Sequence, residues 1–294
     1  MAAYSFVTVD VFTEKRFGGN PLAVLPDARG LSDADMQALA AEFNLSETTF
    51  VLPPADPANT ARVRIFNRRH EMPFAGHPNV GTGWVLSQLG RATNGVLRFE
   101  EIAGLVEVTA APEGVTIAAP QPLSLGPEMP VDLLARCAGL TAREIVVTAH
   151  RPRSASVGNS FVVAEVAPDA LSHAAPDIAK FRAAVAVYAA MGPNRLPIYL
   201  YARDGAGDPQ RLRARMFSPL SGTVEDPATG SAATPLAALL LSLGQQSEAR
   251  YDIAQGVEMG RPSRLLCTAH RTTDGIRATV GGQCVPVLKG EVSL

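Results

Sequence analysis

Several features are scarce or missing in this 294-residue chain, and each absence argues against particular classes of function or partner. The three cysteines, Cys137, Cys267 and Cys284, have no close spacing, which argues against a disulfide framework or a zinc site and suits a reducing cytoplasm. Only 18% of residues are charged, the net charge is −2, and no cluster of lysine or arginine is present, so we expect no nucleic-acid partner. The longest apolar run, residues 232–243, is too short to span a bilayer, so we expect no membrane partner.

Cofactor motifs are missing as well. The glycine-rich stretches contain neither Gly-Lys-Ser/Thr nor G-x-G-x-x-G, the usual phosphate-binding patterns. His70 and His77 have no further histidine or cysteine at ligand spacing, so no metal is expected. The first residues lack a basic region followed by an apolar core, so no signal peptide is expected and the protein is predicted to be cytoplasmic. Neither a metal site nor a nucleotide-binding motif is therefore expected.

What the chain does contain is ample apolar sequence and one unusual loop. With 47% hydrophobic residues, the length allows one large domain or two of ordinary size. The stretch Val-Glu-Asp-Pro-Ala-Thr-Gly-Ser-Ala, residues 224–232, precedes the apolar run, which is predicted to be a buried helix with Pro235 in its first turn. A glycine loop that leads into a helix start presents unpaired backbone N–H groups, and it is a typical anion-binding device.

The same pattern occurs once more, 154 residues earlier. Glu71, Pro73 and Gly76 align with Glu225, Pro227 and Gly230, and a Leu-Gly stop ends both helical runs. Upstream, Arg-Val-Arg-Ile-Phe at 62–66 matches Arg-Ala-Arg-Met-Phe at 213–217. We interpret this as an internal duplication, and two related half-domains would place two helix starts across a ligand cleft.

The remaining elements are mostly short strands with a few helices. This pattern favours an α+β fold with mainly antiparallel sheet. Residues 120–130 carry four prolines and are predicted to be the crossing between the halves. Helices are predicted at residues 33–43, capped by Ser32, at 131–138 and at 175–191. Strands are predicted at residues 4–12, 22–25, 62–66, 96–99, 104–108, 115–118, 145–148, 160–165, 196–202, 211–217, 265–268, 276–280 and 285–287.

Five blocks carry a family resemblance that runs from about residue 4 to residue 290. Together they resemble the PhzF-like family of phenazine biosynthesis. The blocks are Gly-Asn-Pro-Leu-Ala-Val at 19–24, Asn-Leu-Ser-Glu-Thr-Thr-Phe at 44–50, Phe-Ala-Gly-His-Pro at 74–78, Glu-Asp-Pro-Ala-Thr-Gly-Ser-Ala at 225–232, and Gln-Gly at 255–256 with Gly-Arg-Pro-Ser at 260–263.

The resemblance implies a diaminopimelate-epimerase-like fold. Such proteins have two pseudo-symmetric lobes, each a barrel-like, mainly antiparallel sheet around a central helix, with the site between the lobes. Here the N-terminal lobe would cover residues 1–119, completed by 284–294, and the C-terminal lobe residues 120–283. The resemblance also suggests a homodimer.

The resemblance further implies how the chemistry works. Epimerase relatives use one cysteine in each glycine loop, but the matching positions here are Ala75 and Thr229, which cannot exchange protons at neutral pH. PhzF-like members instead use one glutamate, which matches Glu47. A single base can move a proton between two carbons of one conjugated system, which is a cofactor-independent isomerisation. Burial against Leu45 and Phe50 is expected to raise the pKa of Glu47 towards the working pH.

The roles expected of the other site residues follow from the chemistry of each residue type. His77 would hydrogen-bond the substrate, and Asp226 would bind an amino or hydroxyl group or hold His77 in one tautomer. Gly76, Gly230 and Ser231 would hold a substrate carboxylate with backbone N–H groups and the Ser231 hydroxyl.

Some alternatives stay open. Glu47, His77 and Asp226 could be capping or turn residues, and Asn20 is expected to be structural. For Arg261 and Ser263 the residues alone do not separate turn packing from contacts between copies. A non-catalytic small-molecule-binding protein on the same fold is the alternative function. An epimerase is the other, and it would need a second base, for which His77 is the candidate. The hypothesis that these residues favour is an isomerase of a small carboxylate-bearing metabolite.

Overall fold

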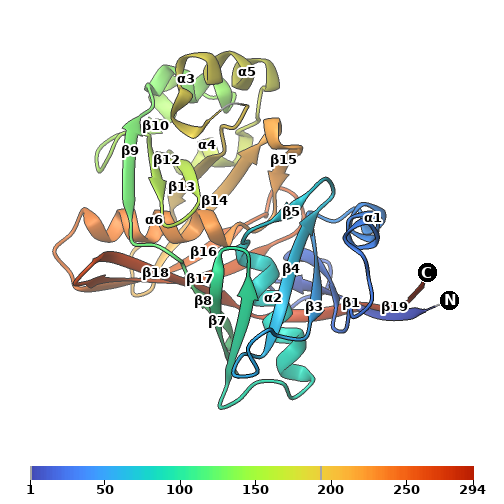
Figure 1. Ribbon diagram of the computed structural model, residues 1–294. Coiled ribbons are helices and arrows are strands. Elements are labelled where there is room, and N and C mark those ends of the chain that lie inside the picture. The colour runs from blue at the N-terminus through green and yellow to red at the C-terminus, as the bar shows by residue number, and fades with distance from the viewer. Residues whose placement is uncertain (1, 193) are drawn as a thin grey trace. The chain divides into compact units, whose positions relative to one another are not determined.

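Strands predominate in the computed structural model, which describes residues 2–192 and 194–294 (Figure 1). The chain divides into two compact units. Unit 1 consists of two segments, the residues up to Ala118 and Gly281–Leu294. Unit 2 is the segment between them, Ala119–Val280. The α+β class predicted from the sequence is confirmed.

Unit 1 contains two helices and nine strands among its described residues. The helices are α1 (Asp33–Phe43) and α2 (Gly76–Gln88). The strands are β1 (Ala3–Val11), β2 (Asn20–Leu25), β3 (Glu47–Leu52), β4 (Ala61–Asn67), β5 (Glu71–Met72), β6 (Val96–Glu101), β7 (Gly104–Ala111), β8 (Gly114–Ala118) and β19 (Cys284–Ser293).

Unit 2 has more helical turns around a comparable sheet. Its helices are α3 (Val131–Cys137), α4 (Pro168–His173), α5 (Ile178–Val187) and α6 (Gly230–Ser242), with 3₁₀ turns at Ala142–Glu144, Ala189–Met191 and Pro219–Ser221. Its strands are β9 (Ser124–Glu128), β10 (Ile145–Val146), β11 (Arg153–Ser156), β12 (Ser160–Val166), β13 (Ile198–Arg203), β14 (Gln210–Ser218), β15 (Thr223–Asp226), β16 (Glu248–Gln255), β17 (Ser263–Thr272) and most of β18 (Gly275–Gly282).

The two units repeat one strand topology, which confirms the internal duplication. In unit 1 the paired strands run β19, β1, β2, β3, β4, β6, β7 and β8, and only β2–β3 and β4–β6 are parallel. In unit 2 they run β9, β11, β12, β13, β14, β16 and β17, and only β12–β13 and β14–β16 are parallel. The parallel pairs occupy the same places in both orders.

Each unit is built around one buried helix. Helix α2 packs against strands β1, β2, β3, β7 and β8, and α6 packs against β11, β12, β16 and β17 (Figure 1). Gly81 of α2 shows how close this packing is, because a Cβ there would lie 2.6 Å from Leu22 Cδ2 and 2.7 Å from Val11 Cγ2. The helix therefore needs glycine at this position to approach the sheet.

A matching ion pair supports each glycine loop. Arg64 binds Glu71 in unit 1, with Nη2 at 2.6 Å from Oε2, and Arg215 binds Glu225 in unit 2, with Nε at 2.8 Å from Oε1. Each guanidinium also lies over the ring of the phenylalanine two residues later, with 5.1 Å and 4.9 Å to the ring centres. The duplication thus extends to side-chain contacts.

Three predictions about elements need correction. The helix expected at 175–191 begins at Ile178, because Asp177 caps it by accepting from the N–H groups of Ala179 and Lys180, and it ends at Val187 before a 3₁₀ turn. The proline-rich crossing at 120–130 contains β9, which pairs with β11. Strands β11 and β16 were not predicted, and β11 (Arg-Ser-Ala-Ser) has none of the β-branched or aromatic residues that mark a strand.

Across the described parts of the chain, none of the helices has the length and apolar character needed to cross a membrane.

Candidate active site

Glu47 is the first residue of β3, and the strand's own alternation turns it towards α2. The Oγ1 atoms of Thr49 and Thr82 lie 2.8 Å apart, and both side chains are fully buried, so the Thr49 face of β3 looks onto α2. Glu47 lies two residues before Thr49 and shares its face. Glu47 lies about 6.6 Å from Thr49 along the strand, and His77 lies about 7.5 Å from Thr82 along the helix. Because Thr49 and Thr82 touch, these similar distances place Glu47 beside the start of α2.

The structure brings Glu47 and His77 together. His77 Nε2 lies 3.5 Å from Glu47 Oε2, and the side chains are 7% and 17% exposed. Burial lowers the pKa of His77 to about 3, against the opposing effect of a hydrogen bond to the Pro21 backbone. The imidazole is therefore neutral at neutral pH, and its contact with Glu47 is a contact between polar groups rather than an ion pair.

Asn20 is part of this site, although the sequence assigned it only to a turn. Its Nδ2 lies 3.4 Å from His77 Nδ1, and its Oδ1 accepts a hydrogen bond from the Ser46 hydroxyl at 3.3 Å. Asn20 is 1% exposed. A buried amide between Ser46 and His77 holds the imidazole ring in place. The position of Asn20 one residue before a proline, within a motif block, was the only signal in the sequence.

The start of α2 offers further unpaired groups. Its N-cap residue, Ala75, makes no side-chain capping bond, so the side chain leaves the first-turn N–H groups at Gly76 and His77 without a cap. Within the described residues, His77 Nε2 is buried with no partner at hydrogen-bond geometry. A buried nitrogen of this kind beside a carboxyl group and a helix start suits an anionic or polar ligand.

Asp226 lies in unit 2, at the end of β15, where Thr229 and Gln255 bind it. The Thr229 hydroxyl donates to Asp226 Oδ2 at 2.6 Å. Gln255 Nε2 donates to the Asp226 carbonyl at 2.8 Å and to Thr229 Oγ1 at 3.0 Å, and the Thr229 N–H and the Tyr199 hydroxyl donate to Gln255 Oε1. Gln255 thus holds the Asp226 loop, a role that the sequence analysis did not assign.

The Gly-Ser pair of the second loop forms the first turn of α6. Gly230 is buried and Ser231 half-buried, and the N-cap Thr229 makes no side-chain capping bond because its hydroxyl serves Asp226. The loop passes close to Gly256, where φ is +72° and a Cβ would lie 2.6 Å from the Pro227 carbonyl oxygen. Only glycine fits there without strain.

Local hydrogen bonds hold the block at 260–263. Ser263 opens β17 opposite Gln255, and its hydroxyl donates to the Arg261 carbonyl at 3.1 Å. The Arg261 N–H donates to the Gly256 carbonyl at 3.0 Å. These bonds close the turn that positions Gln255.

The two positions that the sequence resemblance aligned with epimerase cysteines are the N-cap residues of α2 and α6. Ala75 and Thr229 occupy equivalent places before α2 and α6, and Thr229 has its hydroxyl bound to Asp226. The three cysteines are buried and free, and burial raises the pKa of their thiols. No group of three potential metal ligands occurs among the residues described.

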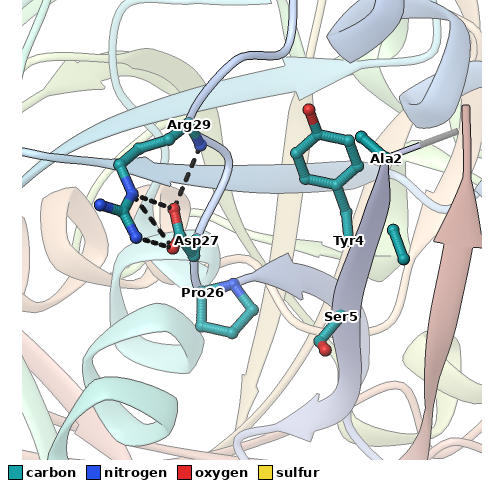
Figure 2. A pocket seen from close by; sticks show the side chains of 7 residues that line it. Ala2, Tyr4, Ser5, Pro26, Asp27 and Arg29 are labelled. Atoms are coloured by element: carbon teal, nitrogen blue, oxygen red, sulfur yellow. Dashed lines mark hydrogen bonds and ion pairs between the residues drawn. The ribbon is translucent and has the colours of Figure 1, made fainter.

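Two surface hollows in unit 1 involve none of the site residues predicted from the sequence. One, of about 490 Å³, is lined by Tyr4, Pro26, Asp27 and Arg29 among others, and Figure 2 shows its Asp27–Arg29 pair, at 2.6 Å between Oδ2 and Nη2. The other, of about 530 Å³, includes Phe6 and Trp84. The exposed ion pair is satisfied and stabilises little.

Solved structures identify the class of fold to which the chain belongs. The chain resembles the solved structure of a PhzF-family phenazine biosynthesis protein from Bacillus anthracis, with a TM-score of 0.88 and 24% identity over all of both chains. A hydroxyproline epimerase from Agrobacterium vitis, 14% identical, shares the fold with a TM-score of 0.60 over 99% of this chain and 93% of that one. This is the diaminopimelate-epimerase-like fold.

The chain belongs to the phenazine biosynthesis-like protein family, whose model matches residues 9–290. A trans-2,3-dihydro-3-hydroxyanthranilate isomerase from Pseudomonas chlororaphis is 34% identical, over 99% of this chain and all of the relative. Full-length similarity to such proteins makes this chain an isomerase, so the resemblance predicted from the five blocks is confirmed.

Proposed function

We propose that the protein isomerises a small carboxylate-bearing metabolite with Glu47 as its proton carrier. The Glu47 carboxylate removes a proton from a substrate carbon, the C–H electron pair enters the conjugated system, and protonated Glu47 returns the proton to another carbon of that system. The observation that carries this proposal is the 3.5 Å approach of Glu47 to a neutral, buried His77 at an uncapped helix start. A positioned base contributes about 10²–10⁴-fold in rate.

His77 would donate or accept a hydrogen bond at the substrate without carrying charge. Asp226 would bind an amino or hydroxyl group with the carboxylate that Thr229 orients. The N–H groups of Gly76, Gly230 and Ser231 would hold the substrate carboxylate and stabilise enolate-like charge. That the two helix starts serve one substrate in a cleft between the lobes stays a prediction from the sequence.

The substrate class that we propose is taken from the name of a full-length relative. The Pseudomonas chlororaphis protein is named for a cyclic, unsaturated amino acid carboxylate. A substrate of that chemistry, a carboxylate attached to a conjugated ring or chain, fits a single-base proton shift without a metal or redox cofactor.

Epimerisation by Glu47 and His77 is less suitable. Inversion at carbon needs two groups on opposite faces, and a carbon does not fit between atoms 3.5 Å apart. A histidine whose pKa is lowered to about 3 is also a weak base. A purely binding role is disfavoured because full-length relatives are named isomerases.

The test is Glu47→Gln with candidate carboxylate substrates in deuterated water. We expect turnover to fall by about 10²–10⁴-fold while ligand affinity is retained, since the amide keeps the shape but cannot take a proton. Glu113→Gln makes the same change at an exposed turn and should leave turnover unaltered. Unchanged turnover and label exchange in Glu47→Gln would refute the mechanism.

We also propose that the protein works as a homodimer in the cytoplasm. The dimer follows from the family resemblance. The reducing compartment suits three free, buried cysteines.

A further inference from the structure

Glu101, the last residue of β6, is a buried carboxyl group outside the motifs. In the described structure both of its carboxyl oxygens are inaccessible to solvent and lack a partner at hydrogen-bond geometry. Its polar neighbour is Asn79, which is fully buried in the first turns of α2 and whose Oδ1 also lacks a partner. Three unpaired polar atoms in one place are costly and call for an explanation.

A single proton satisfies all three atoms. A carboxylic acid and a carboxamide are complementary, because the acid O–H can donate to the amide oxygen while one amide hydrogen donates to the acid carbonyl. The second amide hydrogen of Asn79 is already used, since Nδ2 donates to the Ala75 carbonyl at 3.1 Å. A carboxylate could still accept the free amide hydrogen, but its second oxygen and Asn79 Oδ1 would both be left without a donor.

This pair lies against the loop that leads to His77. Asn79 is two residues beyond His77, and its amide holds the carbonyl of Ala75, the N-cap residue of α2. In the turn after Glu101, the Ala103 N–H donates to the Pro73 carbonyl at 3.0 Å. One bond from the β6–β7 turn and one from Asn79 of α2 therefore hold the loop before α2.

We propose that Glu101 is a neutral carboxylic acid paired with Asn79, and that this pair is a positioning element for the start of α2 and its His77. The inference rests on the proposed function for its effect on turnover, but its structural part stands without it. No substrate contact is assigned to Glu101.

The surroundings of Glu101 are consistent with the neutral form. Burial raises its pKa from the ordinary 4.5 to about 8, opposed only by Asn79. No charged side chain contributes to this shift. The nearest titratable groups along the two elements are His77 on α2, which is neutral, and Glu100 on β6, whose carboxylate is bound by the N–H groups of Ala55 and Asp56.

The linkage between pKa and stability has a definite sign. Below about pH 4.5 folded and unfolded chains both carry the Glu101 proton, and the pair contributes its full stability. Between 4.5 and about 8 only the unfolded chain releases the proton, so the free energy of unfolding falls as pH rises. His77 acts the opposite way, losing stability as pH falls below 6.5, and cancels in a comparison of variants that share it.

Glu101→Gln is the decisive variant, because the amide keeps one donor and one acceptor for Asn79 and cannot ionise. At pH 7 we expect the infrared band of a protonated carboxyl in wild type and in Glu113→Gln, and its loss in Glu101→Gln. The melting temperature of Glu101→Gln relative to wild type should rise between pH 5 and pH 8.5. Absence of the band, or a constant difference in melting temperature, overturns the proposal without reference to activity.

The pH dependence of turnover tests whether Glu101 positions the start of α2. With a Glu101 pKa of about 8, wild-type kcat should fall to about a tenth between pH 7 and pH 9, with KM changing less. Glu101→Gln should abolish this alkaline fall and keep the pH 7 rate, whereas Glu101→Leu should lower kcat at every pH. An alkaline fall in Glu101→Gln equal to that of wild type refutes the positioning role. Failure of Glu47→Gln to lose turnover would refute the proposed mechanism and leave the infrared and melting results standing.

Discussion

At the scale of single residues, the site depends on what holds each polar atom. Glu47 and His77 stood out in the sequence because they lie in distinctive blocks, and the structure places them 3.5 Å apart. Asn20 and Gln255 lie in equally distinctive blocks, yet their roles were not predictable. Each binds partners far away in the sequence, Asn20 at His77 and Gln255 at Thr229 and Tyr199. Only folding brings such donors and acceptors together.

Asn20→Ala should expose this dependence. Losing the amide removes the Asn20 contact to the buried His77 Nδ1, and a buried polar group that loses a partner costs up to about 1–3 kcal/mol. We expect kcat to fall by roughly 5- to 150-fold if that energy acts on the orientation of His77. Steady-state kinetics measures it, with Ser46→Ala as the milder control, since that change removes only the outer bond to Asn20. Equal kinetics in Asn20→Ala and wild type would contradict the orienting role.

At the scale of elements, the buried helices α2 and α6 are the repeated unit. Each spans 13 residues at the same offset of 154. They were recognisable because glycine, proline and leucine recur at fixed spacing, whereas the strands around them differ in composition. Strand β11 was missed since small polar residues form it only through pairing with β9 and β12, a contact that local sequence does not show.

Gly81→Ala tests the close approach of α2 to its sheet. The added methyl would lie 2.6 Å from Leu22 Cδ2, so we expect the free energy of unfolding to fall by about 1–3 kcal/mol, as in other overpacked cores. Urea denaturation measures this. Ser87→Ala, a half-buried position on the same helix, should change it far less. A gain in stability, which alanine would bring in an exposed helix, would contradict the packing argument.

At the scale of the whole molecule, the duplication gives two units with one strand order. The family resemblance also makes a prediction about assembly. We expect a homodimer, so light scattering should give about twice the 30.9 kDa of one chain. A monomer at micromolar concentration would contradict the expectation drawn from the family resemblance, and the mechanism at Glu47 would be unaffected, since Glu47 and His77 come from one unit of one chain.

Linear spacing by itself determined the duplication and the α+β class, because repeated loop-helix patterns and alternating strands are local. The family resemblance of the motif blocks supplied the candidates Glu47, His77 and Asp226. Tertiary structure alone decided the neutrality of His77, the role of Asn20 and the unpaired atoms of Glu101 and Asn79. Charge and hydrogen bonding depend on burial and on which distant groups meet, and neither is a property of neighbouring residues in a chain.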